Sequence, residues 1–430
     1  MGSTLVITND FPPRQGGIET FVHAITTRMP AGRVVVYTSH EAGDAAYDAT
    51  LPFPVVRDRA GTLLPTRRVA GRALEIAREH GCDRVWFGAA APLALLAPAL
   101  RRGGIRRIVA TTHGHEIWWA KAPGARQLLR RIGAGTDAVT YLGRYTRRRI
   151  GPALGPRAGL SRLVPGVDTR RYRPDERARA ATRERLGLHG EEVILCLARL
   201  VPRKGQDMLI RALPLIRRRV PQAVLLLVGQ GPYEARLREL AVRHGVADAV
   251  HFAGGTSHDG TPAYYAAADV FAMPCRTRKG GLEAEGLGIV FLEAAASGLP
   301  VVVGDSGGAP DTVLDGRTGR VVDGRDPAAI AAALVRTLLD PERAAMGAAG
   351  RRWVERDWSW DASARQLMAL LSPEAPPLAG GPASDPAATE YAASTRYAPS
   401  AVDPAVAGRR RPPSDQAASA GPPGEISPVS

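Results

Sequence analysis

The sequence is short of several features that define common protein classes. It has three cysteines in 430 residues, Cys82, Cys196 and Cys275, and they are widely spaced. An odd number without a Cys-x-x-Cys pair argues against a disulfide framework and against a zinc site. We therefore interpret the cysteines as buried apolar side chains in a reducing compartment. No basic segment followed by an apolar one stands at the N-terminus, which predicts no secretory signal.

Long apolar runs and several catalytic signatures are also missing. The longest run, residues 88–100, contains Pro92 and Pro98 and is shorter than the roughly 20 residues of a membrane-spanning helix. Gly-x-Ser-x-Gly, His-Glu-x-x-His and the Walker A loop do not occur. No Asp-x-Asp pair offers carboxylates for a metal-bound nucleotide. These absences argue against the corresponding hydrolases, zinc proteases and P-loop NTPases, and we expect no bound metal.

What is present is enough apolar sequence for two cores, since 45% of 430 residues are hydrophobic. The net charge of +15 is unevenly spread. Residues 1–165 carry 24 Lys and Arg against 11 Asp and Glu, whereas residues 372–430 carry 4 against 6. The basic first half predicts attraction to an anionic lipid surface. We do not expect nucleic acid as a partner, because no aromatic platform or recognition motif accompanies the arginines.

Strand-like apolar runs alternate with helix-length amphipathic segments, which is typical of doubly wound α/β domains. We predict strands over residues 4–8, 33–38, 84–87, 107–111, 138–142, 193–198, 223–228, 250–252, 270–273 and 300–303. We predict helices over residues 17–29, 67–80, 123–132, 204–218, 233–244, 289–297, 327–339 and 344–371. The segment 163–168 separates two series and predicts domains 1–165 and 166–371. The remainder, 372–430, contains twelve prolines, and we predict a disordered tail.

Candidate ligand-binding residues of the first half stand at the carboxyl ends of predicted strands, where open α/β sheets bind ligands. Gly16 and Gly17 lie at a strand-to-helix turn, where backbone N–H groups can face an anion. A simple tight turn is the alternative interpretation. His113 and His115 follow the strand that ends at Thr111, and either histidine is a candidate for touching a substrate.

The second half offers cations and carboxylates at equivalent positions. Arg199 and Lys204 follow its first strand, where they could stabilise the charge of a diphosphate leaving group; a solvated basic loop is the alternative. Glu285 and Glu293 are separated by seven residues, with Glu285 before a predicted helix and Glu293 inside it. A diphosphate would lie near the N-terminus of this helix, whose dipole favours anions. The backbone there belongs to Gly286, Leu287, Gly288 and Ile289.

Taken together, the segments FPPRQGGIE, THGHE, RLVPRKGQD, VGQGPYEARL, RTRKGGLEAEGLGIVFLEAAASGLPVV and SGGAPDTV resemble the retaining GT-B glycosyltransferases of family 4. Within that family the likeness is greatest to actinobacterial mannosyltransferases that act on phosphatidylinositol monomannoside. It runs from about Thr4 to Leu371. It implies a GT-B fold, in which two Rossmann-like domains face each other across a cleft. It also implies retaining transfer of mannose from GDP-mannose to a phosphatidylinositol mannoside.

The resemblance implies a role for each matching residue. Gly16 and Gly17 would hold the donor diphosphate from one domain. Arg199 and Lys204 would grip it from the other, in place of a metal. His113 would contact the transferred sugar, with His115 as the alternative.

Further donor contacts come from the second half of the chain. Glu285 would bind the sugar hydroxyls and Glu293 the ribose, while the backbone at Ala253 and Gly254 would meet the base. The glycine-rich backbone from Gly286 to Ile289 would lie at the diphosphate.

The resemblance and the basic first domain together predict a cytoplasmic protein bound peripherally to the inner face of the cell membrane. The segment 66–78 and the cluster of Arg101, Arg102, Arg106 and Arg107 are its candidate membrane-facing residues. Two alternatives stay open: a family member with another nucleotide sugar or acceptor, and a nucleotide-sugar-binding protein without catalytic activity. The oligomeric state, the nucleobase preference and the acceptor hydroxyl are not determined.

Overall fold

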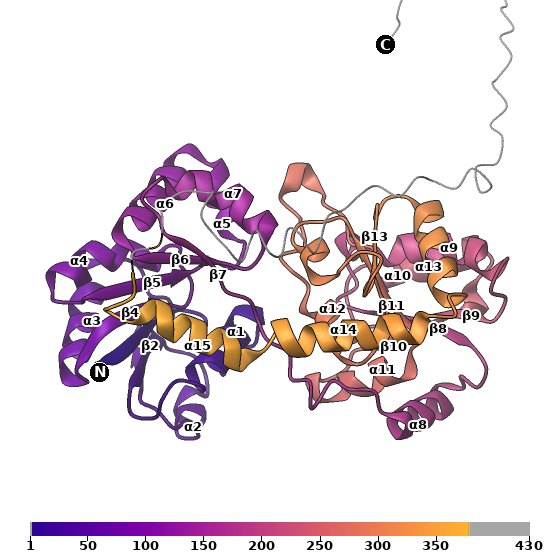
Figure 1. Cartoon of the computed structure of the whole chain (residues 1–430), viewed down its shortest axis with the longest axis horizontal. Helices are drawn as coiled ribbons and strands as arrows, with labels where there is room; N and C mark the ends of the chain where they lie inside the picture. Colours follow the sequence, from indigo (N-terminus) through magenta and orange to yellow (C-terminus); the bar gives the residue numbers. More distant parts are fainter. Residues whose placement is uncertain (1, 377, 379–430) are drawn as a thin grey trace, which may run out of the picture. The chain divides into compact units, whose positions relative to one another are not determined.

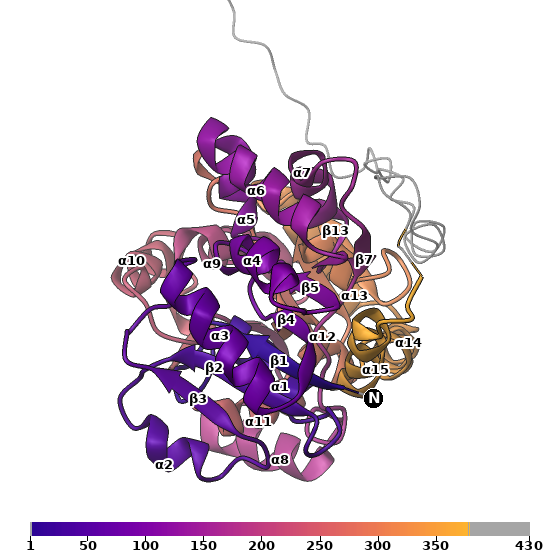
Figure 2. The same ribbon diagram turned by 90° about the vertical axis from the view of Figure 1, so that its left-hand side faces the viewer.

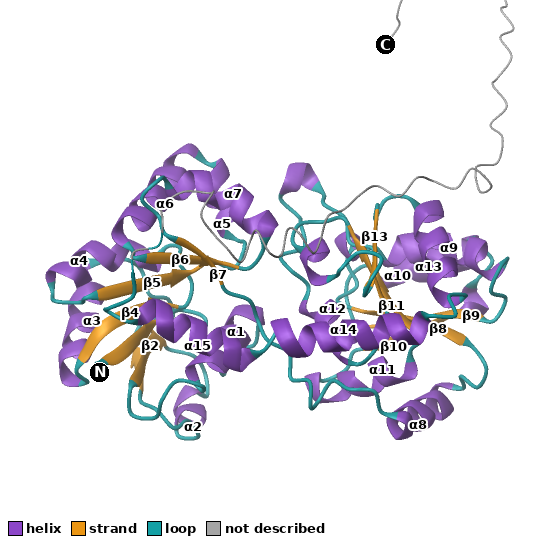
Figure 3. Ribbon diagram, in the orientation of Figure 1, coloured by secondary structure: helices purple, strands orange, loops and turns teal. Residues whose placement is uncertain are grey.

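The computed structural model of the chain describes residues 2–376 and 378, which contain two parallel β-sheets flanked by helices (Figures 1 and 3). This arrangement confirms the predicted fold class of two Rossmann-like domains. Almost all of the predicted disordered tail, residues 372–430, lies outside the described residues.

The first sheet has seven strands in the order β3-β2-β1-β4-β5-β6-β7. These strands are β1 (Ser3–Ile7), β2 (Val34–Ser39), β3 (Val55–Asp58), β4 (Cys82–Phe87), β5 (Arg107–Thr111), β6 (Ala138–Tyr141) and β7 (Leu160–Arg162). The helices of this half are α1 (Gly17–Thr26), α2 (Asp44–Asp48), α3 (Arg67–Glu79), α4 (Ala97–Arg102), α5 (Glu116–Lys121), α6 (Pro123–Gly135) and α7 (Arg144–Leu154). The strand order reverses between β1 and β4, and such a switch point opens a ligand-binding crevice at the carboxyl ends of the strands.

Both faces of the first sheet are buried, because alternate residues of each strand enter different hydrophobic clusters. Leu5 and Val85 belong to the cluster that is covered by α3. Figure 2 shows this helix in front of the sheet. Val6 and Trp86 belong to the cluster that contains Phe21 of α1. This alternation explains why the central strands read as unbroken apolar runs.

The second sheet has six strands in the order β10-β9-β8-β11-β12-β13 and reverses between β8 and β11. These strands are β8 (Glu192–Leu197), β9 (Ala223–Val228), β10 (Val250–Gly254), β11 (Val270–Met273), β12 (Val301–Gly304) and β13 (Gly319–Val322). The helices are α8 (Glu176–Leu186), α9 (Gln206–Arg217), α10 (Glu234–Arg243), α11 (Thr261–Ala267), α12 (Ile289–Ala296), α13 (Pro327–Leu338), α14 (Arg343–Asp357) and α15 (Trp360–Leu371).

The structure corrects two sequence-based expectations about these elements. Strands β3, β7 and β13 were not predicted, and all three lie at sheet edges. The predicted single helix over residues 344–371 is two helices, because Trp358 and Ser359 leave the helical conformation between α14 and α15. Ser359 caps the second helix by accepting a hydrogen bond from the Ala362 backbone. The three cysteines are buried and unpaired, as expected.

Helix α15, although last in the folded chain, packs against α1 and β5 of the first sheet (Figure 1). The ring of Trp360 meets Phe21 edge-on, with centroids 5.7 Å apart. Arg107 is buried and donates from Nε to the Leu370 carbonyl at 2.9 Å. Arg107 therefore does not face a membrane, which corrects its assignment to the exposed basic cluster.

Gly166 allows α15 to dock, since a Cβ at this position would collide with the backbone of Trp360. We expect Gly166→Ala to lower the free energy of unfolding by roughly 1–3 kcal/mol, the usual cost of overpacking. Urea unfolding followed by circular dichroism measures this effect. Gly190→Ala is the matched control, because no heavy atom lies within 4 Å of its added Cβ. Equal stability of the two variants would contradict this account of the docking.

Candidate functional site

The switch point of the second sheet gathers charged side chains from two loops. Lys204 lies in the turn after β8, and its Nζ is 2.7 Å from Oε2 of Glu285. Arg203 donates from Nη1 to the same oxygen at 2.8 Å. Lys204 and Glu285 are 81 residues apart in the sequence and both are largely buried. The structure thus brings together two predicted site residues, and it adds Arg203.

The loops after β8 and β11 are fixed to each other beneath this cluster. Gly205 has φ of +84° and sits against the Pro274 carbonyl, so closely that a Cβ would collide with it. Asp207 forms a two-pronged ion pair with Arg276, with distances of 2.9 and 2.8 Å. Because both partners are largely buried, the pair holds the turn that carries Lys204 in a defined position.

Glu285 is positioned by its own backbone. Its N–H donates to Oγ of Ser306 at 3.3 Å, and its carbonyl accepts from Gly308 N at 2.9 Å. Gly307, with φ of +60°, passes so close to the Glu285 carbonyl that any side chain would clash. Residues 306–308 therefore fix the backbone of Glu285, whose carboxylate points at Lys204.

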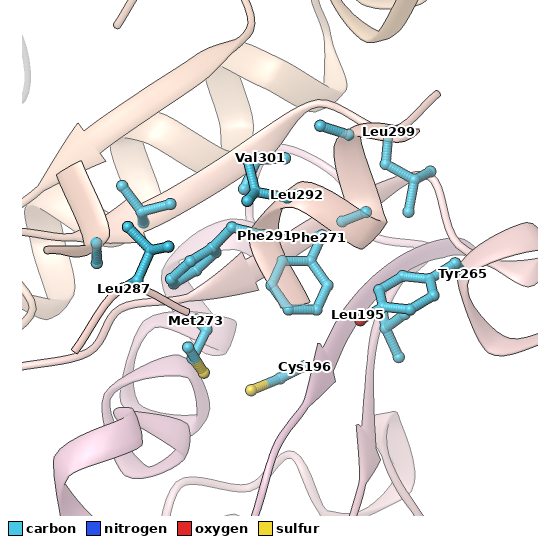
Figure 4. Packing of buried hydrophobic residues seen from close by; sticks show 14 of the residues in the cluster. Leu195, Cys196, Tyr265, Phe271, Met273, Leu287, Phe291, Leu292, Leu299 and Val301 are labelled. Carbon is cyan, nitrogen blue, oxygen red and sulfur yellow. The ribbon is translucent and has the colours of Figure 1, made fainter. Parts of the chain in front are cut away.

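The start of α12 follows directly and leaves backbone donors available. Gly288 precedes the helix with φ of +86°, and no side chain caps its first turn. Leu287 is buried beside Phe291, and Figure 4 shows both in the packed interior. Gly286, which precedes them, is exposed. Uncapped N–H groups at a helix start carry partial positive charge, so this segment suits an anionic ligand.

Glu293 has a different environment from Glu285. It is buried within α12 and accepts a hydrogen bond from the hydroxyl of Tyr265 at 2.9 Å. Burial raises the pKa of Glu293, and hydrogen bonds from Tyr265 and Tyr172 partly oppose this rise. No contact of Glu293 with the cluster of Arg203, Lys204 and Glu285 is found within the described part of the chain.

The other predicted residues of the second half lie on neighbouring loops and strands. Arg199 is exposed just after β8, and among the described residues its guanidinium forms no ion pair. Ala253 is half-buried near the carboxyl end of β10, at the edge of the sheet. Among the described residues, neither of them forms a hydrogen bond or an ion pair with Glu285.

The first sheet presents its own helix start beside its switch point. Gly16 and Gly17 are exposed where α1 begins, and no side chain caps this helix. Arg14 lies nearby and pairs with Glu19 at 3.3 Å. The exposure of both glycines is compatible with the predicted anion contact, and the Glu19 carboxylate lies beside Gly16.

His113 lies after β5 and is fixed from three sides. Its Nε2 donates to the Gly88 carbonyl at 2.7 Å, which leaves Nδ1 as an acceptor. Its ring meets Phe21 edge-on, and its backbone N–H donates to Glu116 at 3.1 Å. Burial lowers the pKa of His113 to about 4, although the hydrogen bond to Gly88 opposes the shift. The imidazole is therefore neutral near pH 7.

His115 and Glu116 complete this loop. His115 is exposed and its Nε2 lies 3.2 Å from Glu116 Oε1. Glu116 is fully buried, and its other oxygen accepts from the backbone N–H groups of His113 and Gly114. Burial raises the pKa of Glu116. Sequence reasoning did not single out Glu116, and its position at the first turn of a helix after two histidines was the available signal.

The His113 pKa predicts a pH dependence of stability. A histidine with a folded pKa of about 4 binds fewer protons than the unfolded chain between about pH 4 and pH 6.5. Its contribution to stability is therefore present above this window and is lost as pH falls through it. We expect His113→Asn to flatten this part of the profile in urea unfolding from about pH 4.5 to 7. His189→Asn, a substitution at an exposed position, serves as the control, and a flattening of equal size in this variant would contradict the assignment to His113.

Loops from the two sheets also meet. Lys121 donates from Nζ to the Gly280 carbonyl at 3.0 Å. The backbone of Gly286 lies close to the His113 carbonyl, since a Cβ on Gly286 would be 3.8 Å from that oxygen. His113 therefore lies beside the Glu285 segment, and the neutral imidazole, the carboxylate and its two cations occupy one region.

Family comparisons match both halves of the chain. Residues 15–171 match the model described as Glycosyltransferase Family 4, and residues 178–353 match the model described as Glycosyl transferases group 1. The chain is 54% identical over 373 residues to a GDP-mannose-dependent alpha-(1-6)-phosphatidylinositol monomannoside mannosyltransferase of Mycolicibacterium smegmatis. This alignment covers 86% of the chain and 98% of the relative. These matches confirm the resemblance drawn from the sequence motifs.

Two further similarities concern the family and the fold, respectively. A GDP-mannose-dependent monoacylated alpha-(1-6)-phosphatidylinositol monomannoside mannosyltransferase of Corynebacterium glutamicum is 48% identical, with 86% of this chain and 98% of the relative covered. Among solved structures, the Anabaena protein HepE in complex with UDP superimposes with a TM-score of 0.71 at 20% identity. That superposition covers 85% of this chain and 98% of HepE, and it bears on the fold alone.

Proposed function

The chain belongs to Glycosyltransferase Family 4, and on that premise we propose that it transfers mannose from GDP-mannose to a phosphatidylinositol mannoside. Relatives at 48–54% identity carry names that state this donor and this class of acceptor. The proposal is a retaining mannosyltransferase that acts in glycolipid biosynthesis.

The observation that carries this proposal is the cluster of Lys204, Arg203 and Glu285 beside His113. The leaving group of the reaction is GDP, whose diphosphate gains negative charge as the glycosidic bond breaks. Preorganised cations and backbone N–H groups stabilise such charge without reorganising. Lys204 and the uncapped start of α12 supply both kinds of donor in one place.

We carry the remaining contacts over from the family resemblance, and the positions of the residues are compatible with them. Arg199 has an exposed guanidinium after β8 that is available to the diphosphate, and the start of α1 at Gly16 and Gly17 faces the donor from the first sheet. Glu285 binds hydroxyls of the mannosyl group. His113 accepts a sugar hydroxyl at Nδ1, because Nε2 is engaged by Gly88.

Glu293 and Ala253 receive the nucleoside under this proposal. Glu293 binds the ribose after its hydrogen bond with the Tyr265 hydroxyl is broken, and the backbone at Ala253 contacts the base. Because the cations of the second half already balance the negative charge of the diphosphate, the reaction proceeds without a metal.

Transfer of radiolabelled mannose from GDP-mannose to phosphatidylinositol monomannoside tests the proposal directly. We expect a labelled mannolipid, with the same yield after exhaustive chelation by EDTA. Calorimetric titration with GDP, UDP and ADP reports base preference, and GDP should bind most tightly. Transfer to a soluble acceptor with no labelled mannolipid would overturn the acceptor assignment, and loss of activity with EDTA would overturn the metal-free mechanism.

The acceptor assignment requires contact with a membrane. No helix in the described part of the chain is long and apolar enough to cross one. We place the protein at the inner face of the cell membrane through the basic first domain, where Arg67 and Arg78 of α3 are exposed. Each well-placed basic residue contributes about 1 kcal/mol at an anionic surface. Co-sedimentation with anionic vesicles at low and high salt measures this attraction, which screening should weaken.

A further inference from the structure

A pocket of about 420 Å³ lies next to the proposed reaction centre and takes no part in donor binding as described above. It begins at Gly114 and His115, directly after His113. Its walls include Trp118 and Trp119 of α5 and Leu282 of the loop that precedes Glu285. The volume falls within the roughly 300–1,000 Å³ range of small-molecule sites.

The apolar wall of this pocket is unusually open to solvent. Trp118 is 61% exposed and Leu282 is 52% exposed, although large apolar side chains elsewhere in the described chain are mostly buried. The exposed indole of Trp118 can stack against the ring of a ligand. A sugar or polyol can pack its C–H groups on the indole face while its hydroxyls form hydrogen bonds with polar residues at the rim of the pocket. His115 provides such a rim.

Lys121 adds a positive charge to the same wall. Trp118 and Lys121 are three residues apart on α5, so their side chains lie on neighbouring positions of one helix face. Nζ of Lys121 donates to the neutral carbonyl of Gly280, and no carboxylate within the described residues pairs with it. A lysine without an acidic partner suits a phosphate group.

We propose that this pocket binds the phosphorylated polyol headgroup of the acceptor, with a ring stacked on Trp118 and the phosphate paired with Lys121. The inference rests on the proposed function, because only an acceptor needs to approach His113 from this side while the donor occupies the Glu285 cluster. Leu282 covers the ring from the opposite loop. Trp118 is thereby a specificity-determining residue for the acceptor.

The test measures KM for the acceptor in Trp118→Ala and Lys121→Met, with GDP-mannose saturating. We expect KM to rise roughly tenfold or more for each variant, which corresponds to the loss of one aromatic or charged contact. The Kd of GDP by calorimetry should not change. Trp118→Phe and Lys121→Arg should recover most of the loss. Because Trp118 is exposed, its truncation should leave the thermal unfolding midpoint unchanged.

Leu282→Ala has a matched control in Leu339→Ala, since both leucines are 52% exposed and Leu339 lies just after α13. Only the first should raise KM for the acceptor. Equal KM values for Trp118→Ala and the unsubstituted protein would overturn the inference. If the unsubstituted protein forms no mannolipid at all, the proposed function itself fails, so the two failures are distinguishable.

A second arm separates headgroup binding from membrane anchoring. The same variants are assayed with acylated acceptor in vesicles and with its deacylated, water-soluble headgroup. Headgroup binding predicts a raised KM with both forms. A rise that occurs only with vesicles would overturn the inference in favour of Trp118 as a membrane anchor.

Discussion

Replacing Glu285 by glutamine is expected to reduce mannosyl transfer by roughly a thousandfold, about 4 kcal/mol, while GDP binding survives. The carboxylate binds the transferred sugar in our assignment and does not touch the nucleotide. It pairs with Lys204 at 2.7 Å and with Arg203 at 2.8 Å. It therefore competes with a diphosphate for these cations, and its neutralisation should leave GDP affinity unchanged or a few-fold higher.

Single-turnover kinetics measure the loss of mannosyl transfer, and calorimetry measures the affinity for GDP. Glu192→Gln is a suitable control, because Glu192 also pairs with an arginine, Arg343, at 2.6 Å but lies at the opposite, amino end of β8. It should retain full activity. Unchanged turnover of the Glu285 variant would refute the sugar-binding role, and a large loss of GDP affinity would show that the carboxylate organises the nucleotide site instead.

Replacing Lys204 by methionine is expected to lower kcat/KM by at least about a hundredfold, roughly 3 kcal/mol, and to weaken GDP binding at the same time. The side chain is only 12% exposed, and its ammonium group pairs with Glu285. A cation in this position stabilises the departing diphosphate more than it stabilises the bound donor. The loss should therefore appear in kcat as well as in KM.

Arg203 provides an internal comparison for this prediction. It contacts the same carboxylate oxygen as Lys204 but is 35% exposed, so we expect Arg203→Met to cost less than Lys204→Met. Arg343→Met, which breaks the remote pair with Glu192, should have no effect on GDP affinity. A larger loss of kcat/KM in Arg203→Met than in Lys204→Met would show that Arg203, and not Lys204, is the main cation at the diphosphate.

The fold was predictable where strands are buried on both faces. Central strands such as β1 and β8 consist of apolar runs that local sequence reveals, and their predicted bounds agree to within about one residue with the structure. The three strands that were missed, β3, β7 and β13, lie at sheet edges and contain only three or four residues each. An edge strand is paired on one side only, so its sequence carries a weaker apolar signal.

The candidate site was predictable as a region but not as a set of contacts. The rule that parallel strands present ligands at their carboxyl ends predicted a site at Lys204, and the start of the helix predicted one at Glu285. The structure shows that these two residues are in contact. Local sequence could not show whether Arg203, Lys204 or both contact Glu285, because both are basic residues in one short turn. The direction of each side chain depends on the β11 loop, which is about 70 residues away.

The sequence by itself determined the α/β class of both halves and the residue types available for diphosphate chemistry, because these follow from periodicity and from the local motifs. The reversals of strand order that create the two switch points are seen only in the structure. Only the tertiary structure decided that His113 is half-buried and neutral while His115 is exposed. It alone turned Arg107 inward to the Leu370 carbonyl, 263 residues away, and brought Trp118 and Leu282 to the same pocket. Burial and partners arise from segments that are distant in the chain, and local sequence does not encode which of them will meet.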